Sequence, residues 1–108
     1  MKLNSLFFAG LLAIFTLSVA SAKTYEITLS SPTKAGSVQL KPGEYRLTVS
    51  GNKAIFVDVQ TTKSFTTGVK IKTSDTKFDD TKIDSAKDGD TNVIKDIQLG
   101  GSKTEIDF

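Results

Sequence analysis

Apolar and polar residues alternate along most of the chain after residue 22. The alternation is clearest in segment 38–49, where Tyr45, Leu47 and Val49 fall on one face of an extended strand. Pro42-Gly43 in this segment predicts a type II turn, because proline presets one φ and glycine tolerates the positive φ that follows. Tight hairpins favour other turn types. We therefore expect an arch, with residues 38–40 paired elsewhere.

The same alternation predicts further strands, separated by segments rich in turn-forming residues. They cover residues 23–30, 54–59, 65–73, 91–99 and 104–108. The sequence has no convincing amphipathic helix. It therefore predicts an all-β fold, a single antiparallel β-sandwich or small barrel of seven or eight short strands.

Three of these segments carry more detailed expectations. Segment 54–59 is apolar on both faces at its start, which predicts a central strand. Gly68 predicts a bulge or a close backbone approach within 65–73. In 91–99 strict alternation would put Val93, Lys95, Ile97 and Leu99 on one face.

Residues 75–84 hold two similar five-residue units, Asp-Thr-Lys-Phe-Asp and Asp-Thr-Lys-Ile-Asp. A continuous strand would put Phe78 and Ile83 on opposite faces, so we expect a loop, kink or bulge between them. A helical turn capped by Ser74 is the alternative, which the weak helix propensity of threonine and aspartate disfavours.

The first 22 residues differ from the rest. Lys2 precedes an apolar run, and Ala20-Ser21-Ala22 supplies the small residues of a cleavage site. The pattern predicts a signal peptide over 1–22. A retained anchor is the alternative, although the run is short for a span. Cleavage would leave one domain of 86 residues (108 minus 22), 23–108, exported to the periplasm or the extracellular space, with no membrane span.

Charge and residue types exclude several functions. Without Lys2 the chain has 13 basic residues (14 minus 1) against 12 acidic ones, and they are not clustered. This argues against nucleic acid as a partner. The chain has neither histidine nor cysteine, which removes the usual catalytic triads, thiol chemistry and thiolate zinc sites. Nothing selects a pair of carboxylates either, so we expect a protein that is not an enzyme.

The sharpest local hypothesis is a Ca²⁺ site at Asp88, Asp90 and Asn92. Oxygen ligands at alternate positions resemble the start of an EF-hand loop. The match fails later, because Val93 and Leu99 stand where that loop needs glycine and glutamate. Further ligands would have to come from the neighbouring segment, where Asp75, Asp79, Asp80 and Asp84 lie. The competing interpretation, which we favour, is an Asp-Gly hairpin turn with solvated acids.

Two other residue types have binding and structural interpretations. Tyr25 and Tyr45 are in phase with apolar neighbours, so we expect them in the core and not as a platform for sugars. Arg46 lies on the opposite face from Tyr45. It is available either to an anionic ligand or, the interpretation we favour, to solvent or a cross-strand partner such as Asp58.

Two segments, 35–47 (AGSVQLKPGEYRL) and 97–106 (IQLGGSKTEI), resemble a group of small exported bacterial proteins of unknown function. The Leu-Lys-Pro-Gly-Glu-Tyr segment is also similar to the start of a strand in prealbumin-like and carboxypeptidase-regulatory-like modules. These resemblances imply an exported β-sandwich and bring no site residues. We expect a non-enzymatic binding or structural module whose partner is a protein or envelope component. A Ca²⁺-dependent module using residues 75–92 is the alternative.

Overall fold

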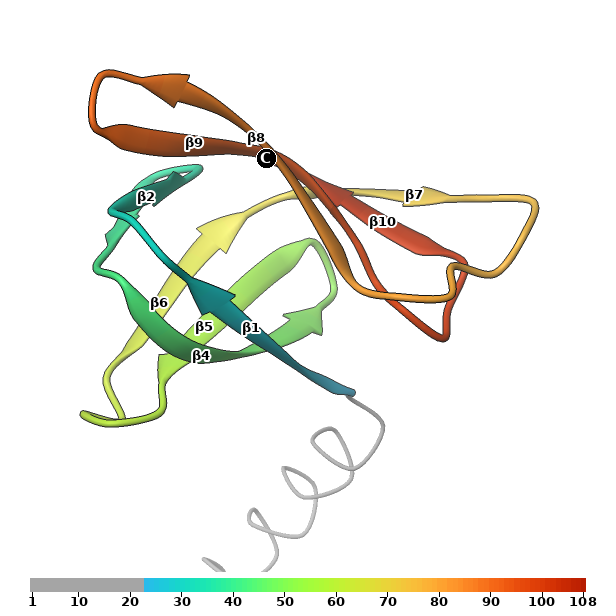
Figure 1. The fold of residues 1–108 in the computed structure, drawn as a ribbon. Helices are drawn as coiled ribbons and strands as arrows, with labels where there is room; N and C mark the ends of the chain where they lie inside the picture. Colours follow the sequence, from blue (N-terminus) through green and yellow to red (C-terminus); the bar gives the residue numbers. More distant parts are fainter. Residues whose placement is uncertain (1–22) are drawn as a thin grey trace, which may run out of the picture.

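The structure, a computed structural model, describes residues 23–108 and contains ten strands in two sheets (Figure 1). The strands are β1 (Thr24–Leu29), β2 (Thr33–Ala35), β3 (Val38–Leu40), β4 (Gly43–Ser50), β5 (Lys53–Asp58), β6 (Ser64–Gly68), β7 (Lys70–Thr73), β8 (Lys82–Asp88), β9 (Thr91–Gln98) and β10 (Thr104–Asp107). The predicted all-β class is confirmed, with ten strands instead of seven or eight. Residues 23–108 include no helix that is long and apolar enough to cross a membrane. The predicted signal peptide lies outside the described residues.

The smaller sheet has the order β1-β4-β5-β6, and all its neighbours are antiparallel. β5 is an inner strand, as its apolar start predicted. Its residues Ile55 and Val57 remain half-buried on the outer side, so only one face of β5 is fully covered. Arg46 on β4 is flanked by Glu26 and Val57, while Asp58 lies opposite Tyr45. The suggested pairing of Arg46 with Asp58 is therefore wrong in register.

The larger sheet has the order β3-β2-β9-β10-β7, and β8 pairs with the other edge of β9. β2 and β10 thus share one edge of β9, β2 at its beginning and β10 at its end. β2 runs parallel to β9, so the sandwich is not wholly antiparallel as predicted. β2 forms within residues 31–36, a segment rich in turn-forming residues, because Thr33 and Ala35 are buried there.

The segment around Pro42 is the predicted arch. β3 belongs to the larger sheet and β4 to the smaller one, so residues 41–42 carry the chain between the two layers. The φ of Gly43 is 147°, and not the value near +80° that a type II turn requires, so that turn type was predicted wrongly. The hydroxyl of Tyr45 donates a 2.7 Å hydrogen bond to the carbonyl of Lys41 and holds the arch against the core.

A second crossing divides the segment predicted as one strand over 65–73. β6 pairs in the smaller sheet and β7 in the larger sheet, with Val69 buried between them. The amide of Val69 donates to the carbonyl of Asn52 at 2.8 Å. The glycine at 68 therefore ends one strand immediately before the chain changes sheets, in place of the expected bulge.

The bulge occurs in β9. Asp96 pairs with Asp84 and Ile94 with Ser85, so Lys95 has no partner on β8. One extra residue reverses the alternation of side chains along a strand. Ile94 is consequently buried together with Ile97 and Leu99, whereas Val93 and Lys95 leave the core. The predicted face of Val93, Lys95, Ile97 and Leu99 is therefore wrong in its first half.

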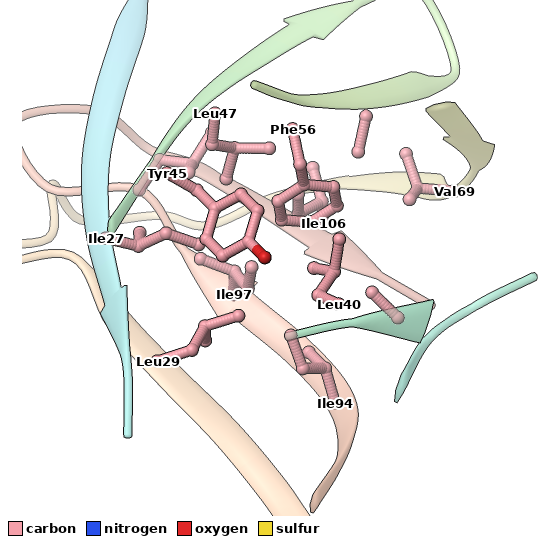
Figure 2. Close-up of a cluster of buried hydrophobic side chains, with 13 residues drawn as sticks. Ile27, Leu29, Leu40, Tyr45, Leu47, Phe56, Val69, Ile94, Ile97 and Ile106 are labelled. Atoms are coloured by element: carbon pink, nitrogen blue, oxygen red, sulfur yellow. The ribbon is translucent and has the colours of Figure 1, made fainter. Parts of the chain in front are cut away.

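The core lies between the two sheets (Figure 2). Tyr45, Leu47 and Phe56 come from the smaller sheet, and Ile97 and Ile106 from the larger one, each at most 1% exposed. The ring of Phe108 lies 6.1 Å from that of Phe56, so the chain end adds to the same cluster. Burial of these side chains is the main term that holds the two sheets together.

Candidate functional site

Four strands of the larger sheet carry an isoleucine row on their inner face. Ile83, Ile97, Ile106 and Ile71 are directly paired across β8, β9, β10 and β7. Ile97 and Ile106 are fully buried, whereas Ile71 is 42% exposed at the outer strand. Because successive side chains alternate between faces, this row determines which residues point outward from the same strands.

The outward row next to the isoleucines is acidic. Asp84, Asp96 and Asp107 are paired directly across β8, β9 and β10, and the row ends at Lys70 on β7. Glu105 lies two residues before Asp107 and so shares its face. We call these four carboxylates the acidic row. Like charges directly opposite each other on neighbouring strands destabilise a sheet, so this arrangement has an energetic cost.

Three members of the acidic row are close enough to offer ligands to one cation. Carboxylate oxygens of Asp96, Glu105 and Asp107 all lie within 4.8 Å of one another, and all three residues are half-buried. Lys72 forms an ion pair with Asp107, with 2.8 Å between Nζ and Oδ2. The other oxygen of Asp107, Oδ1, is buried and has no hydrogen-bond partner among the described residues.

The pKa values of the row diverge because the environments differ. Burial raises the pKa of Asp96, and the charges of Asp84 and Asp107 add to the increase. A hydrogen bond that protonated Glu105 donates to Asp107 raises the pKa of Glu105. The ion pair with Lys72 lowers the pKa of Asp107. A proton entering the row therefore binds to Asp96 or Glu105 before Asp107.

Carboxylate oxygens are the ligands that hard cations such as Ca²⁺ prefer, and Asp96, Glu105 and Asp107 are the residues best placed to offer them. Lys72 already supplies a positive charge to Asp107 within the chain. The acidic row is therefore a surface whose negative charge is partly neutralised by Lys72 of the same chain. The sequence pattern missed it because only the register of β8, β9 and β10 places Asp84, Asp96 and Asp107 opposite one another.

The predicted calcium ligands lie at the far end of the β8–β9 hairpin. Asp88 ends β8 opposite Thr91, and Asp90 occupies the turn, which confirms the predicted Asp-Gly hairpin. Asn92 is half-buried, and its side-chain amide donates a 2.9 Å hydrogen bond to Ser31 Oγ. Because Asn92 is one position beyond Thr91, its side chain faces the opposite side of the sheet from that of Asp88. The hairpin thus does not bring the three residues together.

The other predicted acids are farther away. Residues 74–81 form the expected irregular segment, with no helix, and pack against the 100–103 turn through hydrogen bonds between Phe78 and both Ser102 and Gly101. That turn lies at the opposite end of β8 from Asp88. Six residues of strand correspond to roughly 20 Å, so Asp75, Asp79 and Asp80 cannot complete a site with Asp88 or Asp90.

Arg46 lines a hollow of about 300 Å³ on the outer face of the smaller sheet. Glu26, Glu44, Thr28 and Val59 surround it. Two carboxylates beside the only arginine compete with any anionic ligand. The hollow therefore offers little to the anion interpretation of Arg46.

The second exposed feature is the edge of β8. Six of its seven residues are exposed, and only Ile83 is half-buried. One edge of β8 pairs with β9 along its whole length. No further backbone hydrogen bond in residues 23–108 involves β8. Its outer edge therefore presents unpaired N–H and C=O groups at alternate residues, which is the arrangement that accepts another strand.

Comparisons of the chain with family models, with curated proteins and with solved structures gave no match. By its fold, the described part of the chain is an all-β sandwich of two sheets. β8 is a free edge of the larger sheet, and the acidic row begins on it at Asp84.

Proposed function

We propose that the protein is an exported, non-enzymatic β-sandwich that acts as a binding or structural module of the cell envelope or extracellular space, and that it engages its partner through the free edge of β8. The observation that carries this proposal is the exposure of β8, a seven-residue strand paired on one edge only. Export rests on the apolar run and small residues of 1–22.

A partner can bind by pairing one of its own strands with the edge of β8, and this mode of binding needs no cleft or catalytic group. Main-chain hydrogen bonds to an exposed edge provide affinity, and alternate side chains provide specificity. Proteins usually protect such edges with short strands, lysines, bulges or covering loops. β8 carries Lys82 and Lys87, but the bulge of this hairpin lies in β9, so the backbone of β8 continues without interruption. A regular edge of this length suits an extended partner strand.

Binding of a partner at the β8 edge can be tested in cells that produce the full chain. A photo-crosslinking amino acid at Lys87 should give a discrete crosslinked product in the envelope or medium fraction. The same group at Lys41, which is exposed on the arch, is the matched control and should give none. Equal products from both positions, or none from Lys87, would contradict edge binding.

Export is tested separately on the same cells. Amino-terminal sequencing of the protein recovered from the envelope or medium should begin at Lys23, the residue after the predicted cleavage site. Recovery of the intact amino terminus from the cytoplasm would refute export without bearing on β8.

The calcium-dependent alternative stays a prediction based on Asp88, Asp90 and Asn92. Its weakness is the separation of these residues described above, together with the hydrogen bond of Asn92 to Ser31. A melting experiment with millimolar Ca²⁺ and with EDTA decides it.

A further inference from the structure

We infer that the strand which completes the β8 edge is β8 of a second copy of this chain, in an antiparallel pair with Ser85 on the two-fold axis. This inference rests on the proposed role of the edge and names the partner. It follows from the charge order of β8, Lys-Ile-Asp-Ser-Ala-Lys-Asp, and from the exposure of these side chains.

Symmetry limits how two copies can pair. A two-fold axis perpendicular to an antiparallel pair lies between directly opposed residues, so each possible register places one residue opposite itself. With Ser85 on the axis, Lys82 lies opposite the second copy's Asp88, and Asp84 lies opposite Ala86. By symmetry the Lys82–Asp88 pair occurs twice, once at each end of the seven-residue contact.

The neighbouring registers are disfavoured by like charges. An axis at Asp84 puts that aspartate opposite itself. An axis at Ala86 puts Asp84 opposite Asp88 twice, and an axis at Lys87 puts two lysines together. Like charges directly opposite are destabilising. The Ser85 register is thus the only one that pairs the whole strand without such a contact.

Lys82 and Asp88 are available to pair with a second copy. Lys82 lies opposite Gln98 and Asp88 opposite Thr91 across the β8–β9 ladder, so neither has a charged partner within its own hairpin. Pairing at the free edge would supply one to each of them. It would also join the larger sheets of two copies into one continuous sheet and remove both exposed edges.

Charge reversal tests the register. The purified chain should show concentration-dependent dimers in sedimentation velocity. Lys82→Glu and Asp88→Lys should each weaken the dimer about five- to thirtyfold, because each makes two like-charge pairs from two attractive ones. The double variant should recover the original affinity. Lys77→Glu, at an exposed position of the 74–81 segment, is the control and should leave the dimer unchanged.

A single cysteine gives an independent test, because the chain has none of its own. Ser85→Cys should form a disulfide-linked dimer under mild oxidation, since the two sulfur atoms would meet at the axis. Ala86→Cys is the matched control, because its counterpart in the second copy would lie farther along the strand. Circular dichroism spectra of all variants should match that of the unmodified chain.

The outcomes separate this inference from the proposed function. A chain that stays monomeric at every concentration, with Ser85→Cys no faster to crosslink than Ala86→Cys, would overturn self-pairing. If photo-crosslinking at Lys87 in cells still yields a product containing another protein, edge binding stands without self-pairing. Failure of both experiments rejects both edge binding and self-pairing.

Discussion

Neutralising Asp96 should stabilise the protein, although this residue is half-buried and most substitutions destabilise. Asp96 lies between Asp84 on β8 and Asp107 on β10, directly opposite each of them. Asp96→Asn keeps the shape of the side chain and removes one charge from both like-charge pairs. The raised pKa of Asp96, caused first by burial and then by these two neighbours, shows that the fold disfavours its charged form.

The size of the effect follows from the pairing. Each directly opposed like-charge pair costs about 0.2–1 kcal/mol, so the two pairs together cost about 0.4–2 kcal/mol. Lys72 and Lys95 attract Asp96 and offset part of this cost. We therefore expect Asp96→Asn to raise the free energy of unfolding by about 0.5–1 kcal/mol, or the melting temperature by about 2–8 °C for a domain of this size.

The assay is thermal unfolding followed by circular dichroism at a series of pH values. Because the folded-state pKa of Asp96 lies above its unfolded value, protonated Asp96 favours the folded state. This stability is fully present below the unfolded pKa and is lost as the pH rises through the raised folded-state pKa. The advantage of Asp96→Asn should therefore be largest at neutral pH and disappear on acidification below the unfolded pKa of Asp96. Comparing the two proteins at each pH isolates Asp96 from Asp107, whose lowered pKa has the opposite effect on stability.

Asp79→Asn is the matched control. Asp79 is exposed in the 74–81 segment, away from the acidic row, so its neutralisation should change the stability by less than about 0.5 kcal/mol. A loss of stability in Asp96→Asn at neutral pH, or an advantage that does not depend on pH, would refute the assignment of these three aspartates to one face.

Three further predictions concern the turns and the calcium hypothesis. Gly36→Ala should lower the free energy of unfolding in urea by about 1–3 kcal/mol, because φ is +57° and the added Cβ would overlap Thr67 Oγ1. Gly51→Ala is the control, because φ is +61° there and the space is open, so it should lose less. Equal losses would contradict the overlap. Tyr45→Phe should lose about 0.5–1.5 kcal/mol, because it removes the hydrogen bond to the arch, and unchanged urea unfolding would argue against that bond. The calcium hypothesis predicts that millimolar Ca²⁺ raises the melting temperature and that Asp88→Ala with Asp90→Ala abolishes the increase; no shift with Ca²⁺ or EDTA rejects it.

The sequence was sufficient for features that depend on neighbouring residues. Alternation identified β1 and β4, because a half-buried strand repeats every two residues, and a continuous apolar run identified β5. The Asp-Gly turn between β8 and β9 was also predictable, since it follows from the φ preference of glycine. The arch at Pro42 was predictable as well, although its turn type was not. Tyr45 and Leu47 were correctly placed in the core for the same local reason.

Candidate sites were harder to predict, because they depend on which strands become neighbours. Spacing in the sequence drew attention to Asp88, Asp90 and Asn92, which the pleat of the hairpin separates. Asp96 and Asp107 are eleven residues apart and share no motif. They meet only because β10 pairs with β9 in one register.

The sequence by itself thus determined the strand class, the Asp-Gly turn and the apolar faces of β1 and β4, all of which follow from φ preferences and a two-residue period. Tertiary structure alone decided that residues 64–73 divide between two sheets, that β2 runs parallel to β9, and that a bulge at Lys95 reverses the faces of β9. Each of these depends on the burial and hydrogen bonding available from distant strands, which a local pattern does not encode. The same long-range pairing assembled the acidic row and left β8 as a free edge.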